Sequence, residues 1–235
     1  MRWSDEAMTT WPDEAADPDV LGVHEEHALL RGAPWRRFAV LGDSIAEGVG
    51  DPVDGYLTLD WSRRVARGLR SHHPSLAYRN LGARGLRAAE VRERQLEEAL
   101  RWEPELAAVC AGGNDAMARR FDADHVEEQL DALVAPLREA GADVLLFTLM
   151  DVGAAYALPD PYGSRLGERL AQLALVTTAV ARRHDALLVE CAGHPRAADR
   201  SIYSRDLLHL NMRGHAIVAG LATRALPRDP VTLGA

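Results

Sequence analysis

The sequence contains no lysine, and all 27 of its basic residues are arginine. This absence excludes Schiff-base chemistry, a phosphate-loop lysine and a lysine general base. The 35 acidic residues outnumber the arginines and set the formal net charge at -8. Such an acidic balance argues against nucleic acid as a partner, because nucleic-acid-binding proteins usually carry a basic face, and against a polybasic membrane anchor.

Cysteine and long apolar runs are also scarce. The two cysteines, Cys110 and Cys191, are too few for a disulfide framework and lack metal-ligand spacing, so we expect buried thiols. The longest apolar runs, such as 144–150, are far shorter than the roughly 20 residues that span a bilayer. Eight of the first thirty residues are acidic, unlike a signal peptide. These features predict a cytoplasmic location without a membrane anchor.

The chain length of 235 residues suits one large α/β domain. Composition divides it into an acidic N-terminal extension at 1–34, a domain at 35–228 and a C-terminal tail at 229–235. The extension is either flexible or laid across the domain, where it would cover a site, mediate self-association or recruit a partner. A homo-oligomer is possible, and the sequence does not determine the oligomeric state.

Short apolar runs alternate with longer amphipathic stretches from residue 37 onward. Runs without internal alternation are typical of parallel strands that are buried on both faces. The pattern predicts a three-layer α/β/α sandwich with a five-stranded parallel sheet, doubly wound as in flavodoxin. The expected strands are 38–41, 76–81, 106–110, 144–150 and 186–190, and the expected helices are 61–69, 88–100, 126–140, 166–184 and 211–226.

Small and polar residues stand where three of the runs end and in the last loop. These groups are Gly42-Asp43-Ser44, the segment 80–85, Gly112-Gly113-Asn114-Asp115 and the segment 206–211. Each group alone is typical of a turn or a helix cap, and a lone histidine such as His209 is more often structural. Ligands of doubly wound sheets bind at the carboxyl ends of the strands, so we expect the groups to meet there.

Together the four groups supply the parts of an acyl-transfer site. A serine hydroxyl such as that of Ser44 needs a base within hydrogen-bond reach, and a histidine base needs a carboxylate to hold its tautomer. Asp206 and His209 meet this need if their loop makes one tight turn. Backbone N–H groups at glycine turns and an asparagine amide suit the oxyanion of the tetrahedral intermediate.

This set resembles the four sequence blocks of the SGNH hydrolases, also called GDSL esterases and lipases, in order and spacing over residues 38–225. The resemblance implies that Ser44 is the nucleophile, His209 the base and Asp206 its orienting carboxylate. It also implies an oxyanion hole made by the Ser44 N–H, the Gly82 N–H and the Asn114 amide. The implied reaction needs no metal and no organic cofactor.

One departure from the family pattern concerns the residues after Ile45. The family block often continues as Gly-Asp-Ser-Leu or Gly-Asp-Ser-Ile-Thr, whereas Ala46-Glu47 follow here. This difference alters the pocket rim and leaves the nucleophile in place. Asp43, Arg84 and Asp115 border the five chemical positions and are our candidate substrate-binding residues.

Other site types fit the sequence less well. The Gly-x-Ser-x-Gly elbow of the larger α/β-hydrolases is absent, and the glycines at 42, 48 and 50 lack a phosphate-loop lysine. His24 and His27 are three residues apart, whereas a zinc-binding helix needs two histidines four residues apart.

The resemblance implies a hydrolase of small-molecule carboxylic esters that works through an acyl-serine intermediate. Short- to medium-chain or carbohydrate O-acyl esters are favoured because the sequence shows no obvious apolar cap. Two alternatives stay open: an acyltransferase that uses another acceptor in place of water, and a binding module without turnover. Arg84 either meets an anionic or sugar group or is an exposed charge at a helix entry. The segment 151–164, with Tyr156 and Pro159, is either a lid or substrate loop, or only a connection.

Overall fold

The computed structural model describes residues 12–155 and 161–226. The predicted C-terminal tail at 229–235, residues Tyr156 and Pro159, and the start of the acidic extension lie outside the described residues. The sheet has five parallel strands in the order β2-β1-β3-β4-β5. They are β1 (Arg37–Gly42), β2 (Ala77–Asn80), β3 (Leu106–Cys110), β4 (Asp143–Phe147) and β5 (Leu187–Val189). This flavodoxin-like order confirms the predicted fold class.

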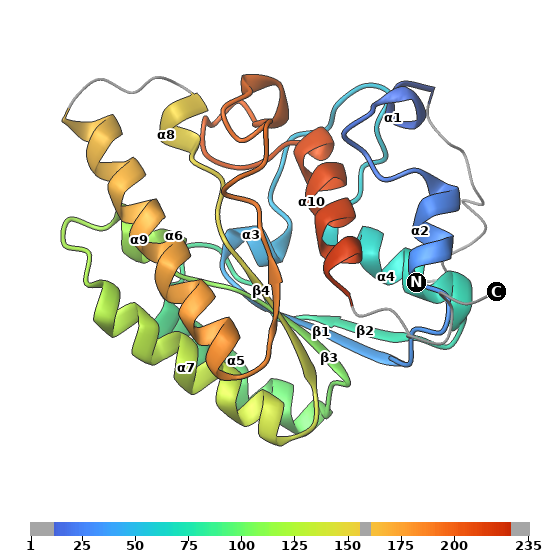
Figure 1. The fold of residues 1–235 in the computed structure, drawn as a ribbon, viewed down its shortest axis with the longest axis horizontal. Helices are drawn as coiled ribbons and strands as arrows, with labels where there is room; N and C mark the ends of the chain where they lie inside the picture. Colours follow the sequence, from blue (N-terminus) through green and yellow to red (C-terminus); the bar gives the residue numbers. More distant parts are fainter. Residues whose placement is uncertain (1–11, 156–160, 227–235) are drawn as a thin grey trace.

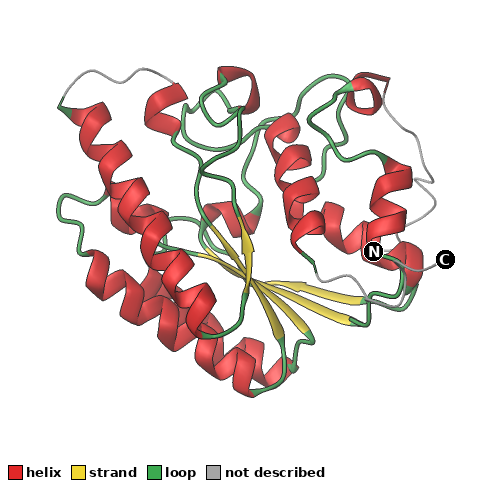
Figure 2. Cartoon of the chain, viewed as in Figure 1, coloured by secondary structure: helices red, strands yellow, loops and turns green. Residues whose placement is uncertain are grey.

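Helices cover both faces of the sheet, as Figures 1 and 2 show. Alternate strand residues point to opposite faces, so Phe38 and Val40 join one core while Ala39 and Leu41 join the other. The first core packs under α4 (Trp61–His72) and α10 (Met212–Ala225). The second packs under α5 (Ala88–Trp102), α7 (Ala123–Glu139) and α9 (Tyr162–Arg183).

The five long helices confirm the predicted ones, with shifts at their ends that capping explains. Helix α7 begins at Ala123, three residues before the predicted start, because the Asp122 side chain accepts from the His125 N–H. Asn211 is the N-cap of α10 and accepts from the N–H groups of Arg213 and Gly214. Strand β4 ends at Phe147, so residues 148–150 of the predicted strand lie beyond the sheet.

Three short helices at the carboxyl ends of the strands are not predicted by the hydrophobic pattern. These are α3 (Ser44–Glu47) after β1, α6 (Gly113–Met117) after β3 and α8 (Val152–Ala155) after β4. Each is too short to show a helical repeat of apolar residues. They place the candidate site residues at one edge of the sheet.

The described part of the acidic extension, residues 12–34, packs against the domain. It contains α1 (Pro12–Ala16) and α2 (Val23–Leu29), and α2 lies beside α4 and α10 (Figure 1). Leu30 is buried in the core between these helices. No helix in the described ranges has both the length and the apolar character needed to cross a membrane.

Candidate active site

The nucleophile candidate Ser44 is the first residue of α3, directly beyond β1. The sequence Gly42-Asp43 makes the sharp exit from the strand possible. Gly42 has φ +144°, and a Cβ atom there would lie 2.0 Å from the carbonyl oxygen of Cys110. The Asp43 carboxylate caps α3 by accepting from the Ile45 N–H at 3.0 Å. The glycine and the cap therefore fix the backbone position of Ser44 at the start of α3.

Asp206 and His209 lie in the loop between the 3-10 helix η1 (Arg200–Ile202) and α10. His209 Nδ1 is 2.6 Å from Asp206 Oδ2, and His209 Nε2 is 2.8 Å from Ser44 Oγ. The other carboxylate oxygen of Asp206 accepts from the N–H groups of Leu208 and His209, each at 3.0 Å. These contacts close the tight turn that the three-residue spacing requires, and Leu207 takes a left-handed conformation with φ 62° within it.

Hydrogen bonds determine both the ionisation of Asp206 and the tautomer of His209. Burial alone would raise the pKa of Asp206, but hydrogen bonds from the His209 side chain and from the two backbone N–H groups hold the pKa below its ordinary value. The ionised carboxylate accepts from Nδ1–H, which leaves Nε2 as the acceptor for the Ser44 hydroxyl. Ser44, His209 and Asp206 thus form one continuous chain of hydrogen bonds.

Asn114 lies on α6 and lines the same pocket as Ser44 and His209. Its amide nitrogen donates to the Leu86 carbonyl at 2.9 Å and to Asp43 Oδ2 at 3.3 Å. Ser44 occupies the first position of α3, where a backbone N–H has no partner within its own helix. The Ser44 N–H is therefore open to an oxyanion, whereas the Asn114 amide would have to exchange its longer bond, to Asp43, for one to the oxyanion.

Gly82 does not have a free N–H group in the structure, contrary to the role that the sequence suggested. Its N–H donates to Asn80 Oδ1 at 2.8 Å. A Cβ at Gly82 would lie 2.4 Å from the backbone nitrogen of Glu47, so the glycine is needed for close packing against α3.

Gly85 is the better donor candidate, and the sequence interpretation missed it. It has φ +80°, is exposed, and directly precedes Leu86, whose carbonyl accepts from Asn114. Among the described residues, its N–H has no hydrogen-bond acceptor. The sequence feature that could have identified Gly85 is the second glycine of Gly82-Ala83-Arg84-Gly85.

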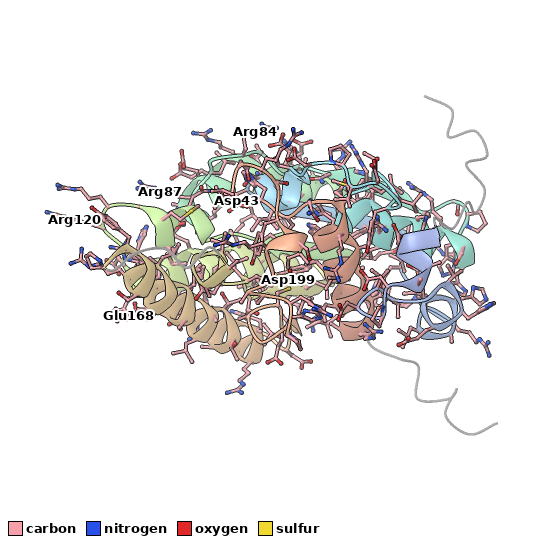
Figure 3. The ribbon with its side chains drawn as sticks, turned by 90° about the horizontal axis from the view of Figure 1, so that it is seen from above. Asp43, Arg84, Arg87, Arg120, Glu168 and Asp199 are labelled. Carbon is pink, nitrogen blue, oxygen red and sulfur yellow. The ribbon has the colours of Figure 1, made fainter. Side chains whose placement is uncertain are left out.

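Each of the three candidate substrate-binding residues has a partner within the protein. Asp43 is buried, and this burial raises its pKa to about 6. Asp115 accepts from the Ala88 N–H at 2.9 Å at the start of α5, and burial raises its pKa. Arg84 pairs with Glu47 at 2.7 Å and lies at the edge of the molecule, whereas Asp43 lies within it (Figure 3). Their contact with substrate stays a prediction.

An apolar pocket opens beside Ser44 and His209. It lies between α6, the residues that follow β4, α8, the first turns of α9 and the His209 loop. The polar residues Asp43, Ser44, Asn114, Thr148 and His209 line it only in part. Its apolar walls include Met117, Leu149, Met150, Val152, Leu166, Leu170, Leu208 and Leu210.

The described residues include neither a cluster suited to a metal ion nor a reactive thiol. No group of three or more His, Cys, Asp or Glu side chains there is arranged to hold a metal ion. Cys110 and Cys191 are free and buried, which confirms the expectation from the sequence. Burial raises the pKa of both thiols, that of Cys191 to about 12, so neither is a reactive thiolate at neutral pH.

The fold is a doubly wound sheet, and a serine, a histidine and an aspartate meet at the carboxyl ends of its strands. Residues 40–217 match the model of the GDSL-like lipase/acylhydrolase family, and the chain belongs to this family. It is a carboxylic ester hydrolase. No curated protein matches the chain.

Several solved structures share the fold at low sequence identity. LAE5, an alpha/beta hydrolase enzyme from the metagenome of Lake Arreo, Spain, is 21% identical with a TM-score of 0.65, over 82% of this chain and 97% of its own. Axe2, an acetylxylan esterase from Geobacillus stearothermophilus, is 18% identical with a TM-score of 0.64, over 83% and 95%. The psychrotrophic esterase EstA from Pseudoalteromonas sp. is 19% identical with a TM-score of 0.61, over 79% and 93%.

Proposed function

We propose that the enzyme hydrolyses esters through a covalent acyl-serine intermediate formed on Ser44. The observation that carries the proposal is the unbroken chain of short contacts from Asp206 through His209 to Ser44 Oγ. His209 Nε2 takes the hydroxyl proton while Oγ attacks the ester carbonyl carbon. The same proton then passes to the leaving alcohol, and a water molecule, deprotonated by His209, releases the acid.

The oxyanion of the tetrahedral intermediate would be bound by three N–H donors. We assign these to the Ser44 N–H, the Asn114 side-chain amide and the Gly85 N–H, in place of the Gly82 N–H. The Asn80 contact of Gly82 and the open position of Gly85 beside Leu86 support this assignment. Donors placed before the reaction stabilise the developing charge without reorganisation.

The acyl group of the substrate would occupy the apolar pocket. Among the described residues, no arginine lines it, and the one carboxylate there, Asp43, accepts hydrogen bonds from the Ile45 N–H and the Asn114 amide. An uncharged acyl chain of short to medium length suits such a surface. A carbohydrate O-acyl ester is also compatible, because its acyl group would enter the pocket while the sugar stays at the rim. Axe2, which shares the fold, is described as an acetylxylan esterase.

Covalent labelling of Ser44 tests the mechanism. A fluorophosphonate probe should label the wild-type enzyme stoichiometrically, and Ser44→Ala should abolish labelling and ester hydrolysis. EstA is described as inhibited by monoethylphosphonate, which supports the choice of probe. Ser164→Ala, which changes an exposed serine on α9, is the matched control and should be labelled normally. Stoichiometric labelling of Ser44→Ala would overturn the proposal.

Narrowing the pocket tests the acyl site. Leu170 lines the pocket from α9 and is buried, whereas Leu175 on the same helix is exposed. With p-nitrophenyl esters from acetate to palmitate, and acetylated sugars assayed beside them, Leu170→Phe should lower kcat/KM for longer chains and spare the acetates. Leu175→Phe should leave the profile unchanged. An equal effect of Leu170→Phe on all esters would exclude this pocket as the acyl site.

A further inference from the structure

Residues 48–51, which we call the clamp segment, connect the nucleophile to the loop that carries Asp206 and His209. The segment begins at the C-terminal end of α3, where the N–H groups of Gly48 and Val49 both donate to the Ser44 carbonyl at 3.1 Å. It then runs along residues 204–212, which carry Asp206 and His209 and which we call the acid-base loop. The clamp segment thus contacts Ser44 at one end and the acid-base loop at the other.

Asp51 binds both ends of the acid-base loop. Its carboxylate accepts from the Arg205 backbone N–H at 2.9 Å and from Arg205 Nε at 3.2 Å. Its carbonyl accepts from the Met212 N–H at 3.0 Å, and its own N–H donates to Ser204 Oγ at 2.8 Å. The residues that Asp51 contacts therefore flank Asp206 and His209 on both sides.

Ser204 closes the loop on itself. Its N–H donates to the His209 carbonyl at 2.7 Å, and its hydroxyl donates to the Leu210 carbonyl at 3.0 Å. The hydroxyl also accepts a hydrogen bond from the Asp51 N–H. The buried Ser204 side chain therefore both donates and accepts a hydrogen bond. This arrangement fixes the backbone of His209 relative to the clamp segment.

Two more contacts hold the clamp segment, one with α10 and one with the loop that precedes it. His215 is buried, which lowers its pKa to about 4, and this neutral imidazole bonds the Val49 carbonyl at 3.1 Å through Nε2. Gly50 approaches the loop so closely that a Cβ atom would lie 2.3 Å from the Leu210 carbonyl oxygen. The bond from His215 and the close approach to Leu210 therefore fix the position of the clamp segment.

We infer that Asp51, together with Ser204, is a positioning residue of the active site, which holds His209 Nε2 within reach of Ser44 Oγ. Neither residue touches the reacting atoms, and both act through the loop backbone. Displacement of a reacting group by about 1 Å can cost about 10²-fold in rate. This inference rests on the proposed function, because it assigns a role relative to the acyl-transfer step.

The test compares Asp51→Ala, Asp51→Asn and Ser204→Ala with Asp54→Ala, which removes a charge from an exposed position in the same loop. Asp51→Ala and Ser204→Ala should lower kcat for p-nitrophenyl acetate by about 10- to 100-fold, with KM within about two-fold of wild type. Phosphonate labelling of Ser44 should slow in parallel. Asp51→Asn keeps an acceptor oxygen for Arg205 and should restore most of kcat, and Asp54→Ala should match wild type.

A spectroscopic readout separates positioning from a loss of stability. The low-field proton resonance of the His209 Nδ1–H bonded to Asp206 should broaden or disappear in Asp51→Ala, at a temperature where circular dichroism shows the variant folded. Wild-type kcat in Asp51→Ala and Ser204→Ala, or equal impairment of Asp51→Asn and Asp51→Ala, would overturn the inference. Failure of wild-type labelling, or normal labelling of Ser44→Ala, would instead overturn the proposed function.

Discussion

The side-chain amide of Asn114 is hydrogen-bonded to the buried carboxylate of Asp43, with 3.3 Å between Nδ2 and Oδ2. Its second bond, to the Leu86 carbonyl, is shorter at 2.9 Å. An oxyanion on the substrate would therefore compete with Asp43, the more weakly held of the two acceptors. The aspartate of the Gly42-Asp43-Ser44 motif thus both caps α3 and accepts a hydrogen bond from the Asn114 amide.

Removal of the Asn114 amide should slow the chemical step. We expect Asn114→Ala to lower kcat by about 10²–10³-fold, since a single oxyanion donor typically contributes that much. KM should change much less, because the bond forms in the transition state. Steady-state kinetics with p-nitrophenyl butyrate measures both constants, and thermal unfolding checks that the variant is folded. An unchanged kcat would remove Asn114 from the oxyanion hole.

The buried Asp43 should make stability depend on pH. Burial raises its pKa from 3.8 to about 6 in the folded state. The folded state thus binds the proton more tightly than the unfolded chain, and stability is lost as pH rises through this interval. The loss is about 3 kcal/mol over the interval. Asp43→Asn lacks this titration, so its free energy of unfolding relative to wild type should rise by that amount between pH 4 and pH 7.

Urea unfolding of both proteins at each pH gives this difference directly. The midpoint of the change should lie between the two pKa values. A difference that stays constant from pH 4 to pH 7 would mean that Asp43 titrates alike in the folded and unfolded states.

Gly82 and Gly85 should respond differently to alanine. A Cβ at Gly82 meets the Glu47 backbone at 2.4 Å, whereas a Cβ at Gly85 meets open space but keeps φ at +80°. Gly85→Ala should therefore cost about 1 kcal/mol, the penalty of a left-handed conformation. Gly82→Ala should cost more, because the backbone itself must move. Chemical denaturation measures both, and equal costs would contradict the packing role of Gly82.

Loss of the Asp206 charge should slow the reaction while the loop keeps its shape. In Asp206→Asn the amide oxygen can still accept from the N–H groups of Leu208 and His209, but the charge that holds the His209 tautomer is gone. We expect kcat to fall by at least about 10²-fold with little change in melting temperature. Asp54→Asn serves as the control. A kcat near that of wild type would show that His209 needs no carboxylate partner.

The acidic segment before the domain should contribute to stability through Asp17 and Arg213. Their side chains are 4% and 16% exposed and lie 2.8 Å apart, and Tyr56 also donates to Asp17. Asp17→Ala removes the acceptor of the Tyr56 hydroxyl, whereas Arg213 keeps its contacts with Asp19 and Asp199, so the free energy of unfolding should fall by about 1–3 kcal/mol. The exposed pair of Glu97 and Arg101 offers the control, and Glu97→Ala should cost less than about 0.5 kcal/mol. Similar losses in both variants would argue against a special role for this contact.

The sequence alone was sufficient for the fold class and for naming the side chains that meet at the carboxyl ends of the strands. Runs such as 106–110 are short and apolar at every position, and they alternate with amphipathic stretches, a pattern typical of parallel strands that helices cover on both faces. The residues Ser44, Asn114, Asp206 and His209 carry their chemistry in their side chains. Their identity, and their place after predicted strands or in the last loop, could therefore be read before any contact was known.

Only the tertiary structure decided which backbone groups are available and what holds the site together. The choice between Gly82 and Gly85 depends on a bond from Asn80, and the role of Asp51 depends on contacts with residues more than 150 positions away. The sequence left open whether Arg84 meets a substrate group or is an exposed charge at a helix entry, and in the structure it pairs with Glu47 on a neighbouring segment. Residue type does not reveal the partners of backbone hydrogen bonds. Every residue except proline has both an N–H and a carbonyl, and how the chain packs determines which groups they meet.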